Sequence, residues 1–188
     1  TGSPLLANDP HLGVGLPGVW TQMGLHCIEV DADCPLDVAG FGFSGVPGVV
    51  IGHNADIAWG FTNLGPDVTD LHLERIDGDT WLYDGEQRPL RLREETIEGA
   101  GGEGVERAVR ATDNGPILSD VSEDLRAVGG EAGPAPGGLE RSYAVSLAWT
   151  ALDPAPTADA LLGFNLASDW DEFRAAAEDF AVPAQNLV

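Results

Sequence analysis

Two apolar runs flank a polar turn in residues 48–63, which read GVVIGHNADIAWGFTN. The first run ends at Ile51 and the second begins at Ile57, with the polar segment His53-Asn54-Ala55-Asp56 between them. Short apolar runs bounded by glycine, asparagine and aspartate are typical of strands joined by tight turns. The stretch therefore predicts two strands, over 49–51 and 57–64.

The same pattern continues on both sides of this stretch. Further strands are expected at 19–27, 36–43, 68–76, 81–85, 89–98, 105–111 and 143–150. After two prolines, a helix is expected over 157–162, and residues 168–172 open a second helix. The apolar residues Phe173, Ala176, Ala177 and Phe180 recur at helical spacing and predict its buried face. The predicted fold class is α+β, a strand-rich antiparallel sheet with a few helices.

The charge of the chain excludes some partners. Asp and Glu number 31 against nine basic residues, all of them Arg, for a formal net charge of -22. Such a field repels nucleic acid and anionic membranes, and no apolar run is long enough to insert into a bilayer. The acids are dispersed along the chain rather than gathered in a tail. A dispersed acidic surface without Lys suits concentrated salt, which screens self-repulsion, so a halophilic source is expected.

The chain has two cysteines, Cys27 and Cys34. Their spacing could close a small hairpin as a disulfide, and two free thiols fit the sequence nearly as well. No CxxC or Cys/His cluster indicates zinc.

Three stretches carry a family resemblance: residues 4–13 (PLLANDPHLG), residues 48–63, and residues 185–188 (QNLV), supported by 66–70 (PDVTD). They resemble the penicillin acylase family of N-terminal-nucleophile hydrolases. The resemblance implies a fragment of an acylase β-chain domain over 1–188, part of a four-layer αββα fold. Residues 1–76 and 143–188 would be its core. Residues 77–142 would be a strand-rich insertion. Within it, residues 127–138 are mostly Gly, Pro and Ala with few large apolar side chains, which predicts a mobile loop.

The resemblance also implies a reaction. In this family a serine at the start of the β chain attacks an amide, with its own α-amino group as the general base. That serine would precede the position of Thr1, so this fragment is expected to lack the nucleophile and to be inactive alone. Thr1 as the nucleophile is a weaker alternative, because the family has an ordinary interior residue there.

Catalytic and substrate-binding residues follow by matching positions in the family. His11 would orient the serine, while the backbone N–H of Asn63 and the side-chain amide of Asn186 would form the oxyanion hole. The acyl pocket would include the apolar residues Leu12, Ile51 and Phe61. Without the resemblance, the asparagines read as turn residues and the apolar residues as core.

The resemblance implies a possible structural calcium ion, held by Asp67, Asp70 and the carbonyl of Thr69. Calcium takes six to eight oxygen ligands, so these three would not suffice. The two carboxylates could instead cap a turn at the start of a strand.

The expected partners are a small-molecule N-acyl amide substrate and the remaining α-chain and β-chain segments of the parent protein, with no nucleic acid, no membrane insertion and no organic cofactor. The expected location is extracellular or at the cell surface. The competing function is a non-catalytic binding module for acylated ligands. A serine, threonine or cysteine directly after a self-cleavage site would distinguish the enzyme from the binding module.

Overall fold

The computed structural model describes residues 2–9, 12–13, 15–132 and 141–188. The chain divides into two compact units, the first comprising 1–66 and 153–188 and the second 67–152. The sequence placed the boundaries between core and insertion at 76/77 and 142/143 instead. Strands β6 (Thr69–Asp77) and β12 (Arg141–Trp149) pair over their whole lengths. Because of this pairing, both strands belong to the second unit, together with the strands between them in the sequence.

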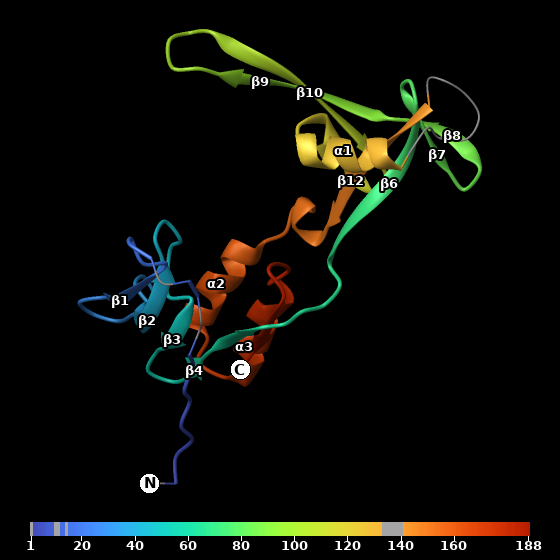
Figure 1. Ribbon diagram of the computed structural model, residues 1–188. Helices are drawn as coiled ribbons and strands as arrows, with labels where there is room; N and C mark the ends of the chain where they lie inside the picture. The colour runs from blue at the N-terminus through green and yellow to red at the C-terminus, as the bar shows by residue number, and fades with distance from the viewer. Residues whose placement is uncertain (1, 10–11, 14, 133–140) are drawn as a thin grey trace. The chain divides into compact units, whose positions relative to one another are not determined.

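The first unit is built on a four-stranded sheet of order β1-β2-β3-β4, seen in Figure 1. Its strands are β1 (Trp20–His26), β2 (Asp37–Phe43), β3 (Ile51–His53) and β4 (Ala58–Trp59), all paired antiparallel. A second, two-stranded sheet pairs β5 (Phe61–Asn63) with β13 (Gln185–Leu187). These pairings join the two ends of the first unit's sequence.

Two helices, α2 (Thr157–Leu166) and α3 (Trp170–Glu178), complete the first unit. Phe164 and Phe173 of these helices are buried with the sheet residues Val38 and Trp59 and with Val49, which precedes β3. Helix α3 is capped by Asp169, whose carboxylate accepts the N–H of Glu172 at 2.9 Å. An acidic residue at this position agrees with the preference for acids at helix N-termini.

Two expectations for the first unit need correction. The strand expected at 49–51 begins only at Ile51, because the backbone of Val49 bonds instead to the side chain of Asn165 (2.8 and 2.7 Å). The strand expected over 57–64 is two strands, β4 and β5, which meet at Gly60. A Cβ on Gly60 would lie 2.7 Å from the Asn8 side-chain oxygen. Only glycine therefore lets the Asn8 side chain approach so closely.

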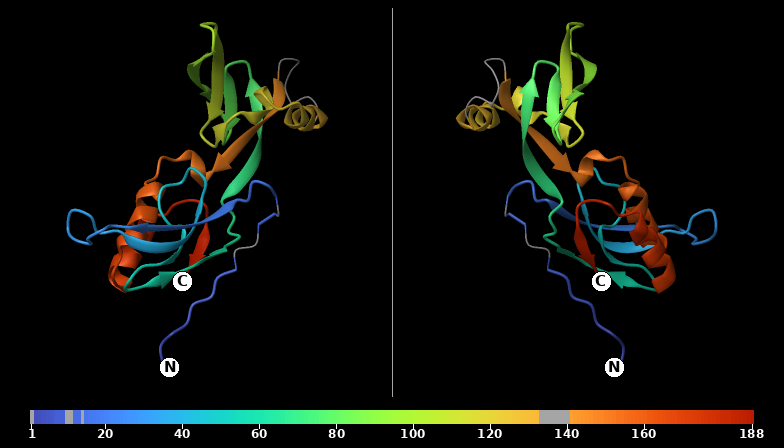
Figure 2. Two further views of the ribbon diagram at one scale, coloured as in Figure 1. Left: turned by 90° about the vertical axis from the view of Figure 1, so that its left-hand side faces the viewer. Right: turned by 90° about the vertical axis from the view of Figure 1, so that its right-hand side faces the viewer.

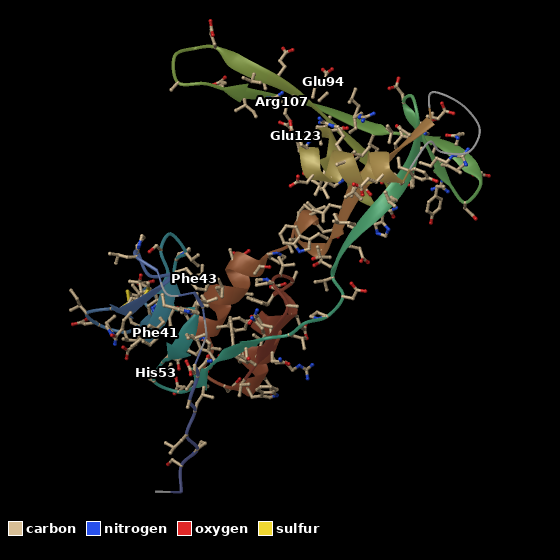
Figure 3. All side chains as sticks on the ribbon, in the orientation of Figure 1. Phe41, Phe43, His53, Glu94, Arg107 and Glu123 are labelled. Atoms are coloured by element: carbon tan, nitrogen blue, oxygen red, sulfur yellow. A yellow bond between two sulfur atoms is a disulfide. The ribbon has the colours of Figure 1, made fainter. Side chains whose placement is uncertain are left out.

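The loop between β1 and β2 is closed by a disulfide between Cys27 and Cys34, with 5.9 Å between the two Cα atoms (Figure 3). The carboxylate of Asp31 accepts the backbone N–H groups of Asp33 and Cys34, each at 2.9 Å. The disulfide is thus formed where the sequence left two alternatives open.

The second unit contains a four-stranded antiparallel sheet of order β12-β6-β7-β8, with β7 at Thr80–Tyr83 and β8 at Glu86–Pro89. A long hairpin of β9 (Arg91–Glu98) and β10 (Gly104–Thr112) extends from this unit, as Figure 2 shows. The short β11 (Gly115–Pro116) pairs with the end of β10. Short 3-10 helices follow at η1 (Leu118–Asp120) and η2 (Thr150–Leu152). Every residue of β9 is exposed.

The small core of the second unit contains Ile76, Trp81, Ile117 and Ala144. Beside it, the buried carboxylate oxygen Oε1 of Glu74 accepts three hydrogen bonds. The donors are the hydroxyls of Thr112 (2.8 Å) and Ser146 (2.6 Å) and the side-chain amide of Asn114 (2.9 Å). This network ties β6 to β12 and to the turn after β10.

An ion pair fastens the hairpin to η1. Arg110 donates from Nε and Nη2 to the two carboxylate oxygens of Asp120, at 2.9 and 2.6 Å. This hydrogen bonding raises the pKa of Arg110.

The mobile loop expected over 127–138 is wrong in its first part, because α1 covers Glu123–Glu131. The hydroxyl of Ser122 accepts the N–H of Leu125 at 3.3 Å, and two acids occupy the first turn. A Cβ on Gly129 would lie 2.5 Å from the Tyr143 carbonyl oxygen. This glycine, which suggested a loop, instead lets α1 approach β12. Residues 133–138 lie outside the described part of the chain.

No helix among the described residues is long and apolar enough to cross a membrane.

Candidate functional site

The pairing of β5 with β13 brings together Asn63 and Asn186, which are 123 positions apart in the chain. In the ladder, Gln185 lies opposite Asn63 and Asn186 lies opposite Thr62. The Asn186 side chain donates from Nδ2 to the Asn63 carbonyl oxygen at 3.3 Å. The Gln185 side chain donates to the side-chain oxygen of Asn63 at 3.2 Å. These contacts keep the amide of Asn186 beside the backbone of Asn63.

The backbone N–H of Asn63 points away from β13. Gly60 and Val188 exchange two backbone hydrogen bonds, at 2.9 and 3.0 Å. Because hydrogen-bonded pairs alternate with non-hydrogen-bonded pairs along an antiparallel ladder, the next hydrogen-bonded pair is Thr62 with Asn186. The carbonyl of Thr62 then faces β13, and the planar trans peptide sends the N–H of Asn63 to the opposite edge. There it has no acceptor among the described residues.

Two residues before Asn63, a side chain binds the same edge of β5 at Phe61. Asn8 accepts the N–H of Phe61 at 2.9 Å and donates to its carbonyl at 3.0 Å. Asn8 thus takes the place of a strand partner at Phe61, and its hydrogen bonds do not extend to Asn63. Beyond Asn8, the N–H of Asn63 lies on this edge of β5. The side-chain amide of Asn186 has two N–H groups, and the hydrogen bond to the Asn63 carbonyl uses only one of them.

A cavity of about 670 Å³ adjoins β5 within the first unit. That volume lies in the range of small-molecule sites, about 300–1,000 Å³. Its lining is mostly apolar, with the polar side chains on β5, β13, α2 and the N-terminal segment. The described lining residues are Asp9, Leu12, Trp20, Phe43, Val46, Val50, Phe61, Thr62, Asn63, Thr157, Leu161, Phe180, Val182, Pro183 and Gln185.

Two of the three residues expected to form an acyl pocket line this cavity. Leu12 and Phe61 are lining residues, and Phe61 packs edge-on against Phe180 with 5.5 Å between ring centroids. Ile51 does not line the cavity; it is 4% exposed and belongs to the core between sheet and helices. His11 lies outside the described residues, and its neighbour Leu12 reaches the cavity.

The expected metal ligands Asp67, Thr69 and Asp70 belong to the second unit, at the start of β6, and all three are exposed. Within the described ranges, no group of three or more His, Cys, Asp or Glu residues could hold a metal ion. The described residues therefore supply no further His, Cys, Asp or Glu ligand beside the three residues that the sequence indicates.

Several cavity residues have no predicted role in the sequence. Trp20 and Phe43 pack with 4.3 Å between ring centroids and form an aromatic wall (Phe43 is labelled in Figure 3). Thr157 opens α2, and its hydroxyl accepts the N–H groups of Ala181 and Val182 at 3.3 and 3.4 Å. No sequence pattern marks Trp20 as a cavity residue, because an aromatic residue in a strand looks the same whether it faces a core or a cavity.

A model of one family, described as penicillin amidase, matches residues 1–188. The chain belongs to the penicillin amidase family. A solved structure, a thermostable penicillin G acylase from Alcaligenes faecalis, matches with a TM-score of 0.66 and 24% sequence identity. The match covers 95% of this chain and 29% of that one. The strand-rich antiparallel fold with a few helices is therefore confirmed, and it is similar to the fold of that penicillin G acylase.

Curated members of the family show the same similarity in sequence. Acyl-homoserine lactone acylase QuiP of Pseudomonas aeruginosa is 34% identical over 125 residues, which is 64% of this chain and 14% of that protein. Penicillin acylase 2 proenzyme of Pseudomonas sp. strain SE83 is 34% identical over 63% of this chain and 15% of its own length. Penicillin G acylase of Escherichia coli is 32% identical over 61% of this chain. The matched part of the chain thus spans about one seventh of these relatives.

Proposed function

We propose that these residues form the acyl-binding and oxyanion-stabilising part of a hydrolase that cleaves the linear amide of N-acyl small molecules. One observation supports this most strongly: the N–H of Asn63 lies on the open edge of β5, beside the Asn186 amide and a mostly apolar cavity. Two fixed donors next to an apolar pocket suit a carbonyl oxygen that becomes negative while its acyl chain is buried.

The proposed reaction runs through an acyl-enzyme. A serine hydroxyl from outside these 188 residues attacks the amide carbon, and its proton passes to the serine's own α-amine. The negative oxygen of the tetrahedral intermediate accepts hydrogen bonds from Asn63 N and Asn186 Nδ2. The C–N bond then breaks, and the α-amine returns the proton to the leaving amine. Water hydrolyses the acyl ester in the same way. An α-amine titrates near pH 8, so it is available as a base near neutrality.

Asn8 and His11 complete the proposed arrangement from the N-terminal segment. Asn8 fixes the edge of β5 through its two hydrogen bonds to Phe61. His11, three residues further on, would orient the serine hydroxyl, as the family resemblance implies.

Calcium remains a structural proposal with no part in the chemistry. The carboxylates of Asp67 and Asp70 and the carbonyl of Thr69 would supply three oxygens, the ligand type that calcium prefers. At least three more would have to come from outside this set, since no larger group occurs in the described ranges.

An extracellular or cell-surface location is part of the proposal. The disulfide between Cys27 and Cys34 supports it, because such bonds persist in oxidising compartments.

The full-length gene product, produced in high salt, tests the proposed function. It should cleave itself into two chains and hydrolyse a chromogenic acyl-anilide, while the 188-residue chain alone should show no turnover. A folded, soluble full-length protein that neither cleaves itself nor hydrolyses any acyl-anilide would contradict the proposal and favour a binding module for acylated ligands.

A further inference from the structure

The side-chain amide of Asn8 bonds one residue of β5 in the way that a neighbouring strand would. Its Nδ2 donates to the carbonyl oxygen of Phe61 at 3.0 Å, and its Oδ1 accepts the N–H of Phe61 at 2.9 Å. An antiparallel strand exchanges the same pair of bonds with the residue opposite it. Because one end of an amide donates and the other accepts, the two bonds fix both the distance and the direction in which the N-terminal segment meets β5.

Gly60, the residue before Phe61, leaves room for this contact. A Cβ on Gly60 would lie 2.7 Å from Oδ1, 3.1 Å from Cγ and 3.2 Å from Cβ of Asn8, the three nearest atoms that it would meet. Gly60 is not among the described glycines with a positive φ, so its backbone conformation alone does not require glycine. The close approach of Asn8 is therefore what excludes a side chain at Gly60.

The contact joins two parts of the proposed site. Phe61 lies two residues before Asn63 on the same edge of β5, about 7 Å away along the strand. Asn8 directly precedes Asp9 and lies four residues before Leu12, and both of these residues line the cavity. Asn8 thus connects the segment that reaches the cavity to the strand that carries the proposed oxyanion donor.

We propose that Asn8 is a positioning residue for the reaction: it holds the N-terminal segment at the distance from β5 at which the serine and the N–H of Asn63 meet one carbonyl group. This inference rests on the proposed function for the roles of the serine and of Asn63. A misplacement of reacting groups by about 1 Å can cost about 100-fold in rate. Asn8 is exposed, and a hydrogen bond at an exposed position adds little to the stability of a fold. Loss of the contact should therefore impair the reaction far more than the folding.

Asn8→Ala removes both bonds, and Asn54→Ala is the matched control. The side-chain oxygen of Asn54 accepts the backbone N–H groups of Asp56 and Ile57 at 2.9 and 2.8 Å. Its Nδ2 donates to the carbonyl oxygen of Ala167 at 2.7 Å. Asn54 is not among the described residues that line the cavity. The control therefore makes the same chemical change and removes at least as many hydrogen bonds, away from the site.

The two variants are compared in the self-processed full-length protein with a good acyl-anilide. We expect Asn8→Ala to lower kcat at least about tenfold and to change KM less than about threefold, because the walls that bind the acyl group are retained. Asn54→Ala should leave kcat within about twofold, yet it should lower the midpoint of urea unfolding more than Asn8→Ala does. An unchanged kcat in Asn8→Ala, or losses of kcat that follow the losses of stability in both variants, would overturn the inference.

Gly60→Ala disturbs the same contact from β5, so it tests the inference even if Asn8→Ala does not fold. We expect it to lower kcat at least about tenfold. In the double variant the added methyl group meets only the Cβ at position 8, 3.2 Å away, which a shift of a few tenths of an ångström relieves. The double variant should therefore lose at most about threefold beyond Asn8→Ala, since two changes that break one contact do not add. An unchanged kcat in Gly60→Ala, or losses that multiply in the double variant, would contradict the role of Asn8.

The activity of the wild-type protein separates this inference from the proposed function. A wild-type protein that hydrolyses no acyl-anilide contradicts both, because there is then no reaction for Asn8 to serve. An active wild-type protein with an equally active Asn8→Ala variant contradicts the inference alone and leaves the proposed function in place.

Discussion

At the scale of single residues, the two proposed oxyanion donors differ in kind, since Asn63 contributes a backbone N–H and Asn186 a side chain. Asn186→Ala should lower kcat of the full-length protein by about two to three orders of magnitude, as removal of one oxyanion donor does elsewhere. Hydrolysis of a good acyl-anilide measures this. An unchanged kcat in a folded variant would exclude Asn186 from the oxyanion hole.

Asn63 allows a matched pair of substitutions. Asn63→Pro deletes an N–H that the ladder with β13 does not use, and proline is tolerated at such edge positions. We expect Asn63→Pro to lose at least about 100-fold in kcat. Asn63→Ala keeps the N–H and should lose at most about tenfold. Equal losses in the two variants would show that the backbone donor has no special role.

Glu74 accepts hydrogen bonds from three side chains of the second unit. Glu74→Ala would leave the buried hydroxyls of Thr112 and Ser146 without their acceptor. We expect a loss of about 2–4 kcal/mol in the local free energy of opening, measured as faster hydrogen exchange in β12. Glu74→Gln keeps an acceptor oxygen and should cost clearly less. Similar exchange in both variants would contradict this role.

At the scale of elements, Asn165 connects helix α2 to the segment that precedes β3 in the first unit. Its side chain bonds both backbone groups of Val49, which is fully buried. Asn165→Ala leaves these groups unpaired and should destabilise the first unit by about 2–4 kcal/mol. Leu166→Ala, at a 48% exposed position of the same helix, should cost about 1 kcal/mol or less. Urea unfolding in high salt compares the two, and equal midpoints would refute the connection.

The elements that the sequence predicted well are those with a strong periodic pattern. The strands at 19–27, 36–43 and 68–76 and the buried face of α3 are confirmed within a residue or two. The failures occur where a distant partner decides the local structure. Asn165 takes the backbone of Val49 out of the ladder, and β12 requires the glycine that suggested a loop at 129.

The candidate site was predictable only in part for the same reason. The motifs of the family indicated Asn63 and Asn186, and the ladder brings them together. The cavity walls at Thr157, Leu161 and Phe180 come from helices whose placement no local pattern specifies. The hydrogen bond from Asn8 to Phe61 joins residues far apart in the chain, so no local pattern predicted a role for Asn8.

At the scale of the whole molecule, the charge of -22 predicts a dependence on salt. Self-repulsion destabilises a compact acidic protein in dilute buffer, and molar salt shortens the screening length to about 3 Å. We expect cooperative unfolding in molar KCl and loss of structure in dilute buffer. Circular dichroism during heating measures this, and equal melting temperatures in the two buffers would contradict the halophilic interpretation.

The central claim is that Asn63 and Asn186 hold one oxygen between them at the entrance of an apolar cavity. The most direct test is a crystal structure of the self-processed full-length protein with an alkyl boronic acid, which forms a tetrahedral adduct with a nucleophilic serine. We expect one boronate oxygen to lie about 2.7–3.1 Å from both Asn63 N and Asn186 Nδ2, with the alkyl chain among Leu12, Phe43 and Phe61. An adduct whose oxygens contact neither asparagine would contradict the claim.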